Sequence, residues 1–179
     1  MIKKENNVAY IDAANLHNGS KALGWKLDYQ RFRVWLKEKY SIQTAYLFIG
    51  LIPKNKELYK YLQECGYTLV FKEVVYDGGG KPKGNCDADL VLQATRDAYE
   101  NNFYKSIVVA SDGDYASLVN FLKDKNKIGF ILSPSIKKRC SILLKRTGVS
   151  IVYLDDKKTI LCLKKGAKNE KAPDTDRTA

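Results

Sequence analysis

Carboxylates follow two apolar stretches of this sequence. Asp112 and Asp114 belong to a Ser-Asp-Gly-Asp motif directly after the apolar residues 107–110, and Asp12 comes directly after the apolar segment 8–11. Short apolar runs bounded by polar and glycine positions are typical of strands buried in a parallel sheet. Ligands of open α/β sheets bind just beyond the carboxyl ends of the strands. These acids therefore indicate a candidate site at one edge of a sheet.

A further carboxylate, Asp87, lies near the start of a helical pattern over residues 85–101. Apolar residues follow it at spacings of four, three and four, as far as Ala98, so Asp87 belongs to the inward face of the predicted helix. The preceding residues 76–84 are rich in Gly, Lys and Pro and predict a loop. We expect Lys83, close to the acid at the end of this loop, to contact substrate.

These carboxylates converge if the first and fourth predicted strands are neighbours in the sheet. Carboxylates packed together repel one another, so such a cluster normally persists by binding a cation. A donor set made only of oxygen atoms favours Mg²⁺ or Mn²⁺. A cation of this kind activates water and stabilises the oxygens of a phosphodiester displacement. The pattern indicates metal-dependent nuclease chemistry.

Strands and helices are predicted to alternate along most of the chain, which favours a mostly parallel sheet with helices on both faces. The polar segment 12–19 is expected to be a flexible turn. Strands are predicted at residues 7–11, 41–50, 67–75, 105–110, 127–132 and 150–154, and helices at residues 27–40, 54–64, 85–101, 115–125 and 137–146.

Composition limits the classes of protein that this chain can represent. Its 179 residues are 45% hydrophobic and 28% charged, which indicates one globular domain. No apolar run approaches the roughly 20 residues that span a bilayer, and residues 1–7 lack the apolar segment of a secretory signal. We therefore expect a cytoplasmic protein that does not bind membranes.

The charged and metal-binding residue types narrow the choice of ligand. The formal net charge of +11 favours a polyanionic partner, most often nucleic acid. Four cysteines without a C-x-x-C pair, and one histidine, argue against a zinc site. His17 is expected to be a solvated loop residue, and Trp25 is the aromatic residue that we do not assign to the core.

Three segments of the sequence resemble the NYN domain, in the LabA-like branch of the PIN-like ribonuclease superfamily. They are residues 10–16, 83–92 and 110–115, in the order that the family has. The resemblance implies a three-layer α/β/α PIN-like fold, an acidic site that depends on Mg²⁺ or Mn²⁺, and RNA as the usual substrate. Residues 1–163 would form this nuclease domain, and the basic residues 164–179 a disordered tail.

The same resemblance assigns roles to individual residues. It implies that Asp12, Asp87 and Asp112 bind metal and that Asp114 is the second acid after the fourth strand. Asn15 would steady Asp12 or contact substrate, and Ser111 would orient the site or bond a phosphate. These four aspartates are the predicted catalytic and metal-binding residues, with Asn15, Ser111 and Lys83 as substrate contacts.

The sequence departs from the family at one position, since Gln93 replaces an aspartate that is common six residues after the first acid of this helix. The amide would weaken metal binding, so the second metal is left open. Asp89 could replace the missing acid only if the helix start is irregular. Otherwise its carboxylate is simply stabilised by the positive end of the helix dipole. Asp114 serves equally well as a cap of the following helix.

Three readings of the function follow. The first is a metal-dependent ribonuclease, and the second is a catalytically weak NYN module that binds RNA or a protein. The third, an aspartyl phosphatase, needs an Asp-x-Asp motif after the first strand, where this chain has Asp12-Ala13-Ala14.

Further candidates for phosphate contact lie at the start of the helix predicted over 137–146. They are the basic residues Lys137, Lys138 and Arg139. The oligomeric state is left open.

Overall fold

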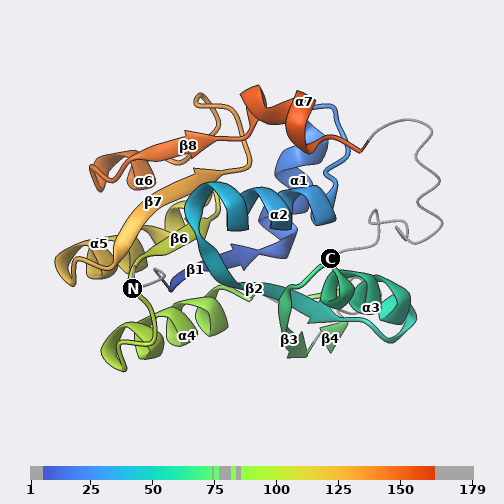
Figure 1. The fold of residues 1–179 in the computed structure, drawn as a ribbon, viewed down its shortest axis with the longest axis horizontal. Helices are drawn as coiled ribbons and strands as arrows, with labels where there is room; N and C mark the ends of the chain where they lie inside the picture. Colours follow the sequence, from blue (N-terminus) through green and yellow to red (C-terminus); the bar gives the residue numbers. More distant parts are fainter. Residues whose placement is uncertain (1–5, 74, 77–81, 84–85, 164–179) are drawn as a thin grey trace.

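The computed structural model describes residues 6–73, 75–76, 82–83 and 86–163. Six strands form a parallel sheet in the order β3-β2-β1-β6-β7-β8 (Figure 1). They are β1 (Asn7–Asp12), β2 (Ile42–Leu51), β3 (Thr68–Glu73), β6 (Ser106–Val109), β7 (Ile128–Ser133) and β8 (Ile151–Tyr153). Two short strands, β4 (Val75–Tyr76) and β5 (Pro82–Lys83), pair separately and antiparallel.

Helices cover both faces of the sheet, because alternate residues of each central strand point to opposite faces. One core cluster joins the sheet to α1 (Ala13–Ala22), α2 (Tyr29–Tyr40), α3 (Lys56–Glu64) and α7 (Lys158–Leu161). The other joins it to α4 (Asp87–Tyr99), α5 (Ala116–Asp124) and α6 (Ile142–Arg146). Short 3₁₀ turns, η1 (Pro53–Asn55), η2 (Gly113–Tyr115) and η3 (Asp155–Lys157), precede α3, α5 and α7. The predicted three-layer α/β/α fold with a parallel sheet is confirmed.

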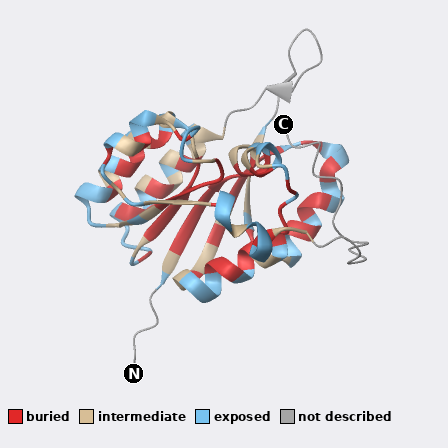
Figure 2. Cartoon of the chain, turned by 90° about the horizontal axis from the view of Figure 1, so that it is seen from above, coloured by how far each residue is buried: buried red, intermediate tan, exposed pale blue. Residues whose placement is uncertain are grey.

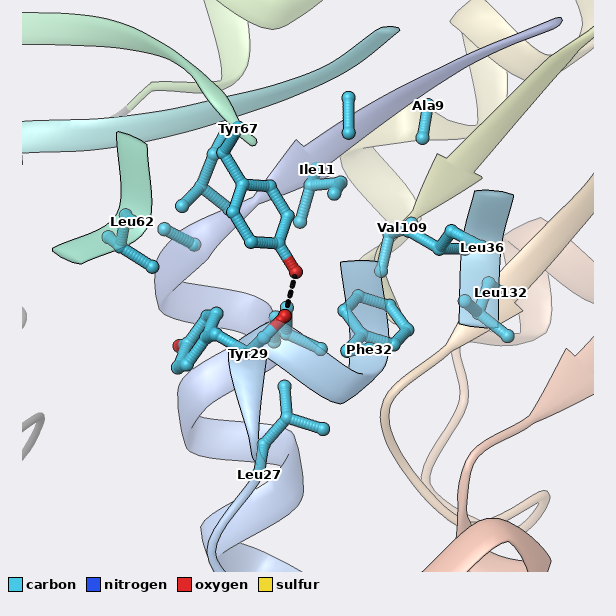
Figure 3. Packing of buried hydrophobic residues seen from close by; sticks show 14 of the residues in the cluster. Ala9, Ile11, Leu27, Tyr29, Phe32, Leu36, Leu62, Tyr67, Val109 and Leu132 are labelled. Carbon is cyan, nitrogen blue, oxygen red and sulfur yellow. Dashed lines mark hydrogen bonds between the residues drawn. The ribbon is translucent and has the colours of Figure 1, made fainter. Parts of the chain in front are cut away.

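Burial follows this layered plan. The central strands β1 and β6 are almost entirely buried between the helices, whereas the edge strands β3 and β8 are partly exposed (Figure 2). On the α1 and α2 side, Ile11 and Val109 of neighbouring strands pack with Phe32 of α2 (Figure 3). The same core contains a polar tie, because the hydroxyl of Tyr67 donates to the backbone oxygen of Tyr29 at 2.8 Å.

The sheet order reverses direction between β1 and β6. The chain runs from β1 outward through β2 to β3, and then returns to β6 and runs outward through β7 to β8. The two inner strands pair in parallel, with Ile11 opposite Val109, so their carboxyl ends lie side by side. Such a switch point opens a crevice where doubly wound proteins bind ligands. Asp12 is the last residue of β1, and Ser111 comes two residues after the end of β6.

The expected flexible turn at residues 12–19 is wrong, because this segment begins helix α1. The Asp12 side chain caps the helix by accepting from the backbone N–H of Asn15 at 2.9 Å. Leu16 and Ser20 are buried on one face of α1, and so is His17, which we had expected to be solvated. Polar residues on the other face obscure the helical period in the sequence.

Two further predictions, for Trp25 and for the helix over residues 137–146, are also wrong. Trp25 is 7% exposed and belongs to the core beside α1 and α2, because the new helix needs an apolar cover. The helix predicted over residues 137–146 begins only at Ile142, where Ser141 caps it. Lys137, Lys138 and Arg139 therefore lie in a turn before α6.

Several predicted features lie wholly or partly outside the described residues. These are the tail at 164–179, the centre of the loop at 76–84 and the side chain of Lys83, whose backbone pairs with Val75. Within the described ranges, no helix combines the length and the apolar character that crossing a bilayer requires.

Candidate active site

A pocket of about 400 Å³ lies at the switch point of the sheet. Three predicted acids and two predicted substrate contacts line it, from segments far apart in the sequence. Its walls are formed by Asp12, Ala14, Asn15, Asn18, Gly19, Asp87, Ser111, Asp112, Ser135 and Arg139.

Asp12 is the most deeply placed of these acids. It ends β1 and is 8% exposed. Burial raises the pKa of its carboxyl group above the usual range, and the negative charge of Asp87 adds to this effect. Hydrogen bonds from the Asn15 backbone and from the Tyr115 hydroxyl, at 2.9 Å each, oppose the rise in pKa. A buried carboxylate with a second acid beside it is poised to gain from a cation.

Tyr115 joins Asp12 to Asp87. It ends η2, its side chain is fully buried, and its hydroxyl contacts Oδ2 of Asp12 at 2.9 Å and Oδ1 of Asp87. Burial and the two adjacent carboxylates raise the pKa of this tyrosine far above its usual value. Tyr115 was not among the site residues predicted from the sequence. The available signal was a phenol, in place of a plain apolar ring, directly after the Ser-Asp-Gly-Asp motif.

Asn15 and Ser111 hold the two inner strand ends together. Oδ1 of Asn15 accepts from the backbone N–H of Ser111 at 2.9 Å, which links α1 to the segment after β6. The hydroxyl of Ser111 pairs with that of Ser133 at 2.9 Å, and Ser133 in turn lies 3.2 Å from the Ser135 hydroxyl. These serine hydroxyls continue the polar wall of the pocket toward β7.

Asp112 and Asp114 take different positions in the turn after β6. Asp112 is exposed, lines the pocket and caps η2 by accepting from the Asp114 backbone N–H at 3.3 Å. Asp114 is exposed in η2 and is not among the pocket's lining residues. Between them, Gly113 allows a close approach to α6, because a Cβ atom there would lie 2.6 Å from Oγ of Ser141.

A cationic residue, Arg139, completes the pocket on the side of the turn before α6. Its neighbours Lys137 and Lys138 are exposed and do not line the pocket. An arginine beside carboxylates at a pocket mouth suits the recognition of a phosphate group.

Two further residues of α4, Asp89 and Gln93, pair with side chains that do not line the pocket. Asp89 forms an ion pair with Lys72 of β3 at 2.9 Å. Gln93 donates through Nε2 to both carboxylate oxygens of Asp97, at 3.0 and 3.1 Å, and does not line the pocket. Helix α4 is regular from Asp87, so Asp89 is not redirected toward the site.

The donor chemistry of the pocket fits a hard divalent cation, since all three acids offer oxygen and Asp12 is both buried and repelled by Asp87. The acids are not gathered into a finished cage. Within the described ranges, no three side chains of His, Cys, Asp or Glu are grouped so that they could hold a metal ion. Asp12, Asp87 and Asp112 are the residues that could supply the ligands.

Fold and pocket together define a doubly wound parallel α/β protein with an acidic site at its switch point. Residues 7–165 match the NYN domain family, so the chain belongs to that family, which is part of the PIN-like nuclease superfamily. No curated protein matches the sequence significantly.

A crystal structure of a protein of unknown function from Vibrio parahaemolyticus is similar in fold. Its TM-score is 0.70 at 20% sequence identity, over 90% of this chain and 99% of that one. At this identity the likeness supports the fold alone.

Proposed function

We propose that this protein is a metal-dependent ribonuclease that hydrolyses phosphodiester bonds in RNA. The observation that carries the proposal is the meeting of Asp12, Asp87 and Asp112 in one pocket at the switch point. Membership of the NYN family supports nuclease chemistry. We also propose that the chain belongs to the LabA-like branch and acts in the cytoplasm.

In this proposal Asp12, Asp87 and Asp112 hold Mg²⁺ or Mn²⁺, and Asp114 supports them as the second acid after β6. A bound divalent cation supplies activation of water and stabilisation of the phosphate oxygens. The other groups bind and orient RNA. Arg139, which lines the pocket, neutralises a phosphate, while Ser111 and Lys83 contact the backbone of the substrate.

Two features of the chain suit RNA as the ligand. The formal net charge of +11 attracts a polyanion over the whole surface. The site itself is a pocket open to solvent that an arginine and three acids line, a donor set that suits a phosphate diester bound next to carboxylates.

The test is cleavage of a labelled RNA that contains both single strands and hairpins. Purified protein is assayed with Mn²⁺, with Mg²⁺ and with a chelator, alongside Asp112→Asn. The proposal expects cleavage that the chelator stops and that the substitution removes, while the exposed Asp112 leaves folding nearly unchanged. Metal-dependent cleavage that persists in Asp112→Asn would remove this residue from the mechanism.

Two observations favour a second candidate, a catalytically weak NYN module that binds RNA or a protein partner. The described residues contain no finished group of three metal donors, and Gln93 stands where the family commonly has an acid. This candidate expects salt-sensitive RNA binding without cleavage under any metal in the same assay.

A further inference from the structure

One tyrosine hydroxyl contacts two acids of the pocket, Asp12 and Asp87. Oη of Tyr115 contacts Oδ2 of Asp12 at 2.9 Å and also reaches Oδ1 of Asp87. The two acids come from different layers of the fold, since Asp12 ends a strand and Asp87 begins helix α4. Tyr115 contacts both of them.

The ring of Tyr115 fixes the position of this hydroxyl. Tyr115 is fully buried, with 0% relative exposure. It belongs to the core cluster that includes Leu90 of α4 and Leu118 of α5. A side chain packed on all sides cannot change its rotamer without opening the core. The hydroxyl is therefore a fixed point against which both carboxylates are oriented.

The hydroxyl has one hydrogen and two carboxylate acceptors. It can donate to one acid at a time, so it orients both carboxylates without neutralising either of them. Groups that hydrogen-bond to metal-binding side chains orient them and raise the affinity of a site for its metal. The same relation holds here between Tyr115 and the acids assigned to the cation.

We infer that Tyr115 is a positioning residue whose hydroxyl holds Asp12 and Asp87 in the paired arrangement that a divalent cation uses. The inference rests on the proposed function, because it takes these acids as the metal ligands. It adds that cation affinity depends on a phenol outside the ligand set. Asp12 and Asp87 would bind metal more weakly with their carboxylates freed from this anchor.

The experiment measures Mn²⁺ binding alone, by calorimetry on the full chain without RNA. Tyr115→Phe removes the hydroxyl and keeps the ring, so the core retains its shape. Tyr10→Phe is the matched control, because Tyr10 is also fully buried and its hydroxyl also donates to an acid of α4. That acid is Asp97, at 2.8 Å, and it does not line the pocket. Circular dichroism and thermal unfolding verify that both variants are folded.

We expect Tyr115→Phe to weaken Mn²⁺ binding by about 10- to 100-fold, as for other partners of metal ligands. Tyr10→Phe should leave the affinity within about twofold of the wild type, since packing of the same layer is disturbed without touching the site. Cleavage of RNA by Tyr115→Phe should recover at high Mn²⁺ concentration, because the hydroxyl acts on occupancy of the site.

Equal Mn²⁺ affinity in the wild type and Tyr115→Phe would overturn the inference and leave the proposed function standing. Equal weakening in both tyrosine variants would also overturn it, since the effect would then come from packing. A wild-type protein that binds no Mn²⁺ and cleaves no RNA would overturn the proposed function itself, and the inference with it.

Discussion

Helix α4 presents two acids to tyrosine hydroxyls, one near each end, and their surroundings differ. Near the carboxyl end, buried Asp97 accepts from Tyr10, from Gln93 and from the Asn102 side chain, at 2.8 to 3.2 Å. At the amino end, Asp87 shares the single hydroxyl of Tyr115 with Asp12. The first acid accepts from three side chains, whereas the second lies beside another acid that contacts the same hydroxyl.

This difference separates a structural acid from a functional one. Buried carboxylates are stable when hydrogen-bond donors satisfy them, and Asp97 meets that condition within the protein. Asp12 and Asp87 contact one hydroxyl, and the charge of Asp87 raises the pKa of Asp12, so a cation beside the pair would relieve this repulsion. The comparison makes the nearness of a second acid, rather than burial, the mark of the site.

Substitution of Asp12 should have the largest effect on activity. Asp12→Asn should lower RNA cleavage by at least about 100-fold, since an amide is a poor substitute for a carboxylate ligand. Near about pH 4 the stability should change little, because asparagine also caps helices well. Cleavage assays with Mn²⁺ and thermal unfolding measure the two effects. Retained cleavage in a folded variant would place the functional acid elsewhere.

The opposite outcome is expected for the satisfied acid. Asp97→Ala leaves the buried Tyr10 hydroxyl without its acceptor and should lower the free energy of unfolding by about 1–3 kcal/mol. Cleavage by the folded fraction, and its dependence on metal concentration, should stay close to wild type. Urea unfolding and Mn²⁺ titration of the cleavage rate measure both. A loss of metal dependence in this variant would contradict the division between the two acids.

The pH dependence of stability should also distinguish Asp12. The pKa of its carboxyl group is raised above the ordinary 3.8 by burial and by Asp87. The folded protein therefore binds this proton more tightly than the unfolded chain, and the resulting stability is full below the ordinary pKa. It is lost as the pH rises through the raised pKa.

In chelator, the melting temperature of Asp12→Asn relative to wild type should thus increase from about pH 4 toward neutrality. Added Mn²⁺ should reduce this difference by stabilising the ionised wild-type site. Thermal unfolding at several pH values provides the measurement. A difference that stays constant across this range would show that the acid pair is not strained by its own charge.

The sequence predicted the frame of the molecule and the general position of the acids. Strand ends are local features, and the carboxyl ends of neighbouring parallel strands share one edge, so Asp12 and Asp112 were expected together. Helix α1 was missed because the spacing of Asp12 and Asn15 is also typical of a turn. The same residues form a helix cap once Leu16 is buried in the core.

The partners of the acids could not be predicted, since they depend on how α4 packs against β1 and η2. The contact of Tyr115 with Asp87 joins residues 28 positions apart, and that with Asp12 joins residues 103 apart. No local period encodes such pairs. The burial of Trp25 could not be predicted for a similar reason, because it depends on helix α1, which the hydrophobic pattern of the sequence did not reveal.

Gln93 gives the smallest and most informative test of the comparison. The family resemblance suggests that an acid at this position would strengthen the metal site, but the Gln93 amide donates to Asp97 and lies outside the pocket. Gln93→Asp should therefore leave Mn²⁺ affinity and cleavage within about twofold of wild type. It should lower stability by about 1 kcal/mol, because Asp97 loses a donor and faces a like charge.

Gln93→Glu is the matched control, since it keeps the length of the side chain and changes only the amide. It should lower stability in the same direction and leave metal affinity equally unchanged. Tighter Mn²⁺ binding in Gln93→Asp but not in Gln93→Glu would mean that α4 brings this position to the site when RNA or metal is bound. The part of α4 that serves the site would then extend beyond Gln93, toward Asp97.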